Sequence, residues 1–170
     1  MAKILDIDLG WNQIKDDLKS LDNSYTKVGV HQGQIHKSED GELSDMVIIA
    51  AANELGTKPR VVGGSSRSGG QILAGGIPSR PFMRNAFDGN KESIKMAQSK
   101  LYNDVITGVR PVRNALSTLG EFLTAKVKLS IKQLKVPPNA PSTIAKKKSS
   151  NPLIDQGQLI QSITHTEFIT

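Results

Sequence analysis

The chain has 170 residues, a length typical of one domain, and apolar residues make up 37% of it, enough to form one core. Its net charge is +6, and it contains no cysteine, which excludes disulfides and zinc–thiolate sites. The segment 1–8 carries acids where a signal peptide needs an apolar run, and the longest apolar run, 46–52, is too short to span a membrane. We therefore expect a protein that is made in the cytoplasm and has no membrane partner.

The N-terminal part of the sequence predicts two short strands with a helix between them. Apolar residues alternate over 3–9 and again over 25–31, which is the period of a strand. Between these strands, four apolar residues recur at helical spacing: Trp11, Ile14, Leu18 and Leu21. Asp8 stands where the N-cap of this helix belongs, and the polar stretch 32–43 is expected to form a hairpin-like connection.

A compact helix is expected over 45–55, with Ser44 as its N-cap and Gly56 at its left-handed stop position. This helix is apolar almost all round, which predicts that it is buried on more than one side. Residues 57–80 are rich in glycine and serine, and we expect them to form a long loop or the end of a long hairpin.

Two longer helices are expected after Pro81, which suits the first turn of a helix. The first helix continues over 91–106 after a break near Gly89, and the second runs from 111 to about 135. A double proline ends the second helix, and residues 137–154 are expected to form an extended arm with at most one turn.

The C-terminal part predicts a short helix over 156–162 and a final strand over 163–169. Asp155 is expected to be the N-cap of the helix and to accept a hydrogen bond from the Gln158 amide, while the Gln158 side chain reaches back in a capping box. Gly157 and Leu159 belong to the same short motif.

The order of these elements predicts an α+β fold. Strands and helices do not alternate as parallel βαβ units require. We expect one domain over 1–170, with a small, mostly antiparallel sheet packed against helices, a flexible loop at 57–80 and an extended arm at 137–154.

No set of residues in the sequence predicts an active site, a cofactor site or a metal site. The serines of 63–70 do not form the Gly-x-Ser-x-Gly turn of a serine hydrolase, and the glycines after them are not followed by a phosphate-binding Gly-Lys-Ser/Thr. His31, His36 and His165 lack the spacing of metal ligands. We therefore expect a protein that is not an enzyme and binds no cofactor.

Glu54 lies late in its predicted helix, where a negative charge is unfavourable to the helix dipole. This position indicates a charged partner such as Arg60 or Arg80, although an exposed glutamate explains it nearly as well.

Basic residues gather between Glu121 and Asp155, a stretch that contains no acid. The lysines are Lys126, Lys128, Lys132, Lys135, Lys146, Lys147 and Lys148. They favour contact with DNA or with an acidic protein surface, and a solvated basic face explains them equally well. Because Phe122 is the aromatic residue in this stretch and belongs to the helix stripe, base stacking is not predicted, and only contact with the nucleic-acid backbone would remain.

Two peptide patterns carry a resemblance to a known family. The first is Asn-Glu-Leu-Gly-Thr at 53–57 followed by Ile-Pro-Ser-Arg-Pro-Phe-Met-Arg at 77–84. The second is Pro-Asn-Ala-Pro-Ser-Thr-Ile-Ala-Lys-Lys-Lys at 138–148 followed by Pro-Leu-Ile-Asp-Gln-Gly-Gln-Leu at 152–159 and Ser-Ile at 162–163. Together they resemble the tail-completion and head–tail joining (neck) proteins of long-tailed bacteriophages.

The resemblance implies a structural virion protein that forms a homo-oligomeric ring, by analogy a hexamer, at the head–tail junction. Such a ring completes the tail or joins it to the head, contacts the neighbouring tail and head-connector proteins, and leaves a channel for genomic DNA. We expect the subunit interface to include Arg80, Pro81, Phe82 and Arg84. A place in the intramolecular core is as good an explanation for Phe82, and a DNA-binding protein that uses the lysines of 126–148 is the alternative function.

Overall fold

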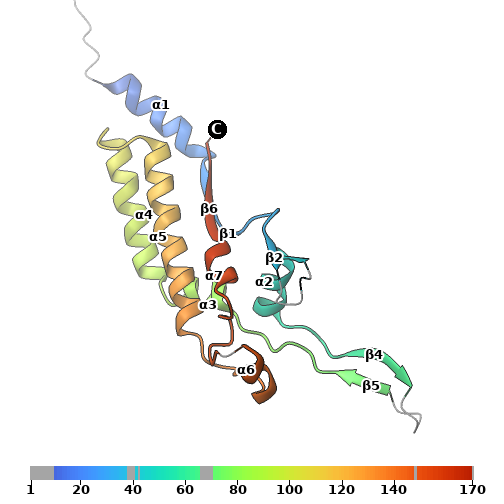
Figure 1. Cartoon of the computed structure of the whole chain (residues 1–170). Coiled ribbons are helices and arrows are strands. Elements are labelled where there is room, and N and C mark those ends of the chain that lie inside the picture. Colours follow the sequence, from blue (N-terminus) through green and yellow to red (C-terminus); the bar gives the residue numbers. More distant parts are fainter. Residues whose placement is uncertain (1–9, 38–40, 42, 66–70, 148, 170) are drawn as a thin grey trace, which may run out of the picture. The chain divides into compact units, whose positions relative to one another are not determined.

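The computed structural model describes residues 10–37, 41, 43–65, 71–147 and 149–169. Within these ranges the chain contains helices and short strands in mixed order, which confirms the predicted α+β class (Figure 1). The strands form three pairs: β1 with β6, β2 with β3, and β4 with β5. No helix in the described ranges is long and apolar enough to cross a membrane.

The contacts of the chain divide it into two compact units, which we call unit 1 and unit 2. Unit 1 contains Met1–Val28, Asn90–Thr124 and His165–Thr170. Unit 2 contains Gly29–Gly89 and Ala125–Thr164. Each unit therefore combines segments that lie far apart in the sequence, and each is described by itself below.

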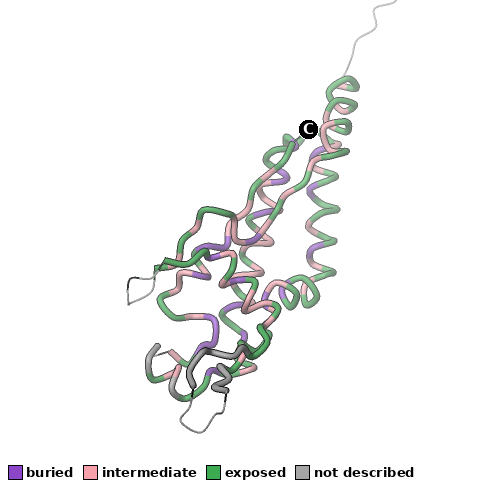
Figure 2. Tube along the Cα trace, turned by 90° about the vertical axis from the view of Figure 1, so that its right-hand side faces the viewer, coloured by how far each residue is buried: buried purple, intermediate pink, exposed green. Residues whose placement is uncertain are grey.

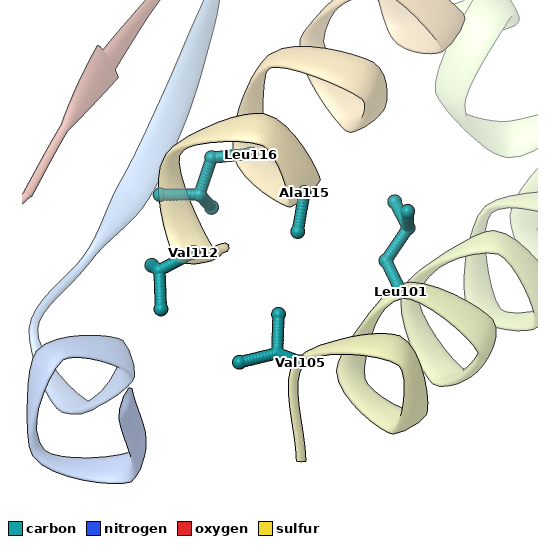
Figure 3. Packing of buried hydrophobic residues seen from close by; sticks show 5 residues of the cluster. All are labelled: Leu101, Val105, Val112, Ala115 and Leu116. Atoms are coloured by element: carbon teal, nitrogen blue, oxygen red, sulfur yellow. The ribbon is translucent and has the colours of Figure 1, made fainter. Parts of the chain in front are cut away.

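The core of unit 1 lies between the helices α4 (Lys91–Ile106) and α5 (Val112–Gln133). Five side chains from the two helices form a hydrophobic cluster, drawn in Figure 3: Leu101, Val105, Val112, Ala115 and Leu116. They recur three or four positions apart on each helix, which places them on one face. Leu21 of α1 (Trp11–Asp22) packs against the same cluster. The long helical stripe predicted from 111 to 135 is confirmed.

The strands β1 (Tyr25–Val30) and β6 (Ile163–Phe168) pair in opposite directions. Tyr25 stacks on Phe168 with 4.9 Å between the ring centres, and the Thr26 hydroxyl donates to the Thr166 carbonyl over 3.4 Å. Later residues of β1 therefore contact earlier residues of β6, as in an antiparallel pair. The strand predicted over 3–9 and the Asp8 cap lie outside the described residues; Gly10 is the N-cap of α1.

In unit 2, the antiparallel pair β2 (Ile35–Lys37) and β3 (Leu43–Asp45) leads directly into helix α2 (Met46–Leu55). Asp45 is the N-cap of α2, because its carboxylate accepts a 2.8 Å hydrogen bond from the Val47 amide. The prediction of Ser44 at this position is wrong by one residue. Ser44 pairs with His36 in the ladder instead, so the helix begins one residue later than expected.

Helix α2 is buried on one side and exposed on the other (Figure 2). Met46 and Ala50 are buried, whereas Ile48 is 68% exposed and Leu55 is 69% exposed. The prediction that this helix is buried on more than one side therefore fails within a single chain. Apolar residues do lie on all sides of the helix, as the sequence shows, but other described parts of the chain bury only the side that carries Met46 and Ala50.

Residues 57–80 contain an antiparallel ribbon, β4 (Arg60–Ser65) with β5 (Gln71–Ala74). Val61 lies opposite Leu73 in its register. The expectation that this segment is the end of a long hairpin is confirmed for the described strands.

Three short helices complete unit 2: α3 (Phe82–Asp88), α6 (Pro141–Lys147) and α7 (Gln158–Ser162). Gly89 separates α3 from α4, as predicted. The arm at 137–154 was expected to hold at most one turn, and this is wrong, because α6 has seven residues. Pro141 begins this helix, a position that suits the fixed φ of proline. The Ile144 amide donates to the Ala140 carbonyl over 3.0 Å.

Candidate functional site

Glu54 links the end of α2 to the beginning of α3. Its two carboxylate oxygens accept hydrogen bonds from the backbone amides of Met83, over 2.9 Å, and Arg84, over 3.0 Å. These amides belong to the first turn of α3, where backbone N–H groups have no partner within the helix and a negative charge is favourable. The predicted arginine partner for Glu54 is therefore wrong: the carboxylate caps a neighbouring helix.

The segment 53–57 runs alongside 76–80, so both halves of the first sequence pattern form one structure. The Arg80 amide donates to the Asn53 carbonyl over 2.6 Å, and the Thr57 amide donates to the Ile77 carbonyl over 2.8 Å. Gly56 has a φ of 76°, and a Cβ there would lie 2.9 Å from the Ile77 carbonyl oxygen. Only glycine fits this position, which explains the Leu-Gly-Thr sequence at the end of α2.

Arg80 joins the first sequence pattern to the second. Its side chain is only 5% exposed, and its guanidinium donates to the Pro137 carbonyl over 3.1 Å, to the Pro138 carbonyl over 3.3 Å and to the Asn139 Oδ1 over 3.0 Å. Burial lowers the pKa of the guanidinium from its ordinary value, yet arginine stays charged at any ordinary pH. A charged fork that donates to three acceptors thus fixes the start of the arm at 137–139.

The four residues predicted for the subunit interface differ in where they lie. Phe82 is completely buried and Arg80 nearly so, and both have their partners within the chain. We therefore assign these two side chains to the core of unit 2, in agreement with the alternative explanation given for Phe82. Pro81 is half-buried, and Arg84 is exposed. An interface role remains a prediction for Arg84.

A further anchor, which the sequence did not reveal, lies between the two parts of the second sequence pattern. Asn151 is 7% exposed, and its Nδ2 donates to the Lys132 carbonyl over 3.1 Å, at the end of α5. Its Oδ1 accepts from the Leu153 amide over 2.9 Å. The side chain thus caps the C-terminus of a long helix and shapes the turn that follows it. Asparagine before proline signals a turn, but only the tertiary structure identifies the helix that it caps.

The capping box predicted at Asp155 is not formed. Gly157 is the N-cap of α7, with a φ of 78° and no side-chain cap, and Asp155 is exposed. The Gln158 side chain instead pairs with the backbone of Lys37, accepting from its amide over 3.1 Å and donating to its carbonyl over 3.0 Å. Because Gln158 holds the β2 strand in place, it is not available to close a box. Leu159 is buried.

The basic residues are only partly described. Lys126 and Lys128 are half-buried on α5, and Lys132 is exposed near its end. Lys146 and Lys147 belong to α6, but the structure does not describe their side chains. Lys148 is not among the described residues. Lys128 and Lys132 are four positions apart, which places them on one face of α5.

A group of polar residues in unit 1 resembles a catalytic set in composition but not in geometry. The His165 Nε2 lies 3.5 Å from the Ser117 Oγ and 3.3 Å from the Glu167 Oε1. A catalytic relay needs the serine and the acid on different nitrogens of the imidazole, so that the acid orients the base. Here both contact the same nitrogen, so this group cannot work as a serine–histidine–acid relay. The described residues also contain no group of three side chains that would hold a metal ion.

Several large apolar side chains lie on the surface of unit 2. Four aliphatic residues on the β2–β3 pair and on α2 are each more than 60% exposed: Ile35, Leu43, Ile48 and Leu55. Single exposed apolar residues are common, and no partner for these four is shown within the described residues.

Comparison of the chain with protein-family models, with curated proteins and with solved structures gave no match.

Proposed function

We propose that the protein is a structural component of a tailed-bacteriophage virion, which forms a homo-oligomeric ring at the head–tail junction. The ring completes the tail or joins it to the head and leaves a channel for DNA. The proposal rests on the two sequence patterns that resemble neck and tail-completion proteins.

The observation that carries the proposal is the hydrogen-bonded junction at Arg80. Residues from both patterns, 57 to 59 positions apart in the chain, meet there in one buried structure. The two patterns therefore contribute to one structural unit, and this supports treating them as one resemblance. Three residues of the first pattern have structural roles: Glu54 caps α3, Gly56 allows a close backbone approach, and Phe82 fills the core.

The surface of unit 2 supports an assembly role. Ile48 and Leu55 expose most of their side chains, although burying such a residue contributes about 1.5–3 kcal/mol. In a protein that forms permanent contacts with other copies, such side chains are buried when the copies associate, and this burial stabilises the assembly.

The test is genetic, in a phage that carries this gene. A stop codon in the gene is expected to give filled heads and separate tails that do not join, seen by electron microscopy of the lysate. Supplying the protein from a plasmid is expected to restore joined particles. Normal virions in the absence of the protein would refute the proposed function.

Non-specific DNA binding is the second candidate function, and the lysines of α5 favour it. Residues 122–154 contain lysines and no acid, and a surface of that charge attracts the DNA backbone. The exchange of Lys128 and Lys132 for glutamine is expected to weaken DNA binding and to lower its salt dependence by about two counterions. If DNA binding is lost while heads and tails still join, DNA contact is a separate property and not the basis of assembly.

A further inference from the structure

A cavity of about 190 Å³ lies within unit 2, lined by residues of β2, of α2 and of the segment 152–159. Its lining is partly apolar and partly polar. Three buried side chains form the apolar part: Met46, Leu153 and Leu159. Since a water molecule takes about 30 Å³ in the liquid, the cavity has room for a few waters or for one long side chain that enters from outside.

The polar part of the cavity suits a cation that donates hydrogen bonds. Asp155 lines the cavity and is exposed, so its carboxylate lies where the cavity opens. Asn53 also lines it; its Nδ2 donates to the Ile49 carbonyl over 2.8 Å, and its Oδ1 accepts from none of the described residues. The described residues that line the cavity include no lysine or arginine. Because a carboxylate and an amide oxygen are both acceptors, the group that fits is a cation with several donors.

Arg84 is an exposed arginine on a fixed part of the backbone. Its amide donates to the Glu54 Oε1 over 3.0 Å in the first turn of α3, whereas its side chain is exposed. Other arginines of the chain have acceptors of their own: Arg80 has three on the arm at 137–139, and Arg110 pairs with Asp104 over 3.6 Å. The Arg84 guanidinium bonds to no other described residue, so its five donors can serve a partner.

Arg84 and Asp155 are opposite charges that the chain itself leaves unused. Arg84 belongs to the first sequence pattern and Asp155 to the second. Other charged residues of the first pattern act within the chain, since Glu54 caps α3 and Arg80 fixes the arm. Arg84 and Asp155 are both exposed, and neither forms an ion pair with another described residue. Two exposed groups of opposite charge on one chain are complementary between copies of that chain.

From these observations we infer that Arg84 of one copy inserts into this cavity of the next copy, where its guanidinium donates to the Asp155 carboxylate and to the Asn53 Oδ1. The methylene groups of the arginine then cover the apolar part of the cavity, and the planar guanidinium serves two acceptors at once. The contact joins two different surfaces, as a closed ring requires. This inference deepens the proposed function, on which it rests, by naming a pair of residues that joins the subunits.

Charge reversal tests this contact. Arg84→Glu and Asp155→Arg are made in separate proteins, and light scattering measures the mass of each in solution over a range of concentrations. Each variant alone places like charges at the contact, so the dissociation constant between copies should rise by roughly thirtyfold or more. Asp155→Asn keeps the shape of the side chain and removes its charge. It should weaken association in the same direction, and it serves as the test if Asp155→Arg does not fold.

Mixing the two reversed variants distinguishes a contact between copies from one within a chain. In the mixture, the intact arginine of one variant meets the intact aspartate of the other, and at alternate contacts the two reversed residues meet with their charges exchanged. Alternation of this kind closes a ring with an even number of copies, such as a hexamer. We expect the mixture to recover the wild-type mass, although neither variant does so alone. Mixing cannot restore a pair within one chain, because each chain keeps its two like charges.

Matched controls reverse a charge elsewhere by the same amount. Lys95→Glu changes an exposed residue of α4, and Glu121→Arg changes an exposed residue of α5; both residues belong to unit 1. Neither control should change the mass, alone or mixed. Circular dichroism of every variant checks that the fold is retained, as expected for substitutions at exposed positions.

Three results would overturn the inference. The first is a wild-type protein that stays a monomer at every concentration, and the second is equal association of the wild type and both reversed variants. The third is assembly that the double variant Arg84→Glu/Asp155→Arg restores and mixing does not, since that result places the pair within one chain. A ring that survives both reversals refutes this contact and leaves the proposed function standing. Joined virions in the absence of the gene product refute the function itself.

Discussion

Arg80 is a charged side chain buried in unit 2. Burying a charge is costly unless hydrogen bonds replace its water, and this guanidinium has three acceptors on the arm at 137–139. The arm in turn is fixed by a residue that lies 57 positions earlier in the chain. The same side chain was expected at a subunit interface, and the sequence alone does not distinguish a carboxylate on another copy from carbonyls on the same chain.

We predict that Arg80→Met lowers the free energy of unfolding by about 3 kcal/mol, because two backbone carbonyls and the Asn139 oxygen lose their donor inside the protein. Lys95→Met is the control, since Lys95 is exposed, and it should change stability by less than about 0.5 kcal/mol. Urea unfolding followed by circular dichroism measures both. Equal stability of the two variants would contradict the role assigned to Arg80.

Glu167 gives a prediction for the dependence of stability on pH. A hydrogen bond from Ser117 and one from its own backbone amide lower the pKa of Glu167 below its ordinary value of 4.5, and the nearby positive charges of His165 and Arg113 add to the effect. Since the pKa is depressed in the folded state, the ionised carboxylate stabilises the protein above pH 4.5, and this contribution is lost as the pH falls through the folded-state pKa.

Glu167→Gln should therefore be less stable than the wild type at pH 7 and equally stable in strong acid. Urea unfolding at a series of pH values checks this, with the exposed Glu121→Gln as the control. A constant difference between wild type and Glu167→Gln at every pH would mean that the carboxylate acts through its shape and not through its charge.

At the scale of elements, close backbone approach decides how the strands and helices meet. Gly120, in the middle of α5, is buried, and a Cβ at this position would overlap the ring of His165 on β6 and lie 2.8 Å from the Thr26 hydroxyl on β1. Glycine normally weakens a helix interior, so its presence here has a packing reason.

Gly120→Ala is expected to destabilise the protein by about 1–2 kcal/mol. Overpacking at such a site costs typically 1–3 kcal/mol, and the better helix propensity of alanine offsets up to about 1 kcal/mol of this. Glu121→Ala, one residue later on the exposed side of α5, is the control and should be close to neutral. Thermal unfolding measures both, and a stabilised Gly120→Ala would show that β1 and β6 do not pack tightly on this helix.

At the scale of the whole molecule, the chain covers its apolar surface incompletely. The core of unit 1 is a small aliphatic cluster, and α1 has no buried residue at all among its twelve. In unit 2 the apolar helix α2 keeps one face exposed. A chain with this balance is expected to gain part of its stability from contact with other copies.

We predict that the midpoint of thermal unfolding rises with protein concentration. Dissociation accompanies unfolding of an oligomer, so mass action favours the folded assembly as more protein is added. Differential scanning calorimetry over a hundredfold range of concentration, roughly, tests this; Leu55→Asp should remove the dependence and Met96→Asp should keep it. A midpoint independent of concentration for the wild-type protein would mean that the exposed aliphatic residues contribute nothing to assembly.

The sequence by itself determined the fold class and most of the helices. Periodic apolar residues, glycines at helix ends and prolines at helix starts are local signals. They located α1, α2, the break at Gly89 and the long α5 within one or two residues. The predicted N-cap of α2 was wrong by one residue. Ser44 and Asp45 both suit that position, and the strand pairing of Ser44 with His36 leaves Asp45 as the cap.

Only the tertiary structure decided the partners of the polar side chains. Glu54, Arg80, Asn151 and Gln158 each bond to backbone that is distant in the sequence, and a hydrogen bond to backbone leaves no mark on the residue type of its partner. The same holds for the capping box predicted at Asp155: its sequence pattern is present, but the Gln158 side chain bonds to the Lys37 backbone instead. Local periodicity specifies which segments become helices. The packing of the whole chain decides which polar side chains and backbone groups form hydrogen bonds.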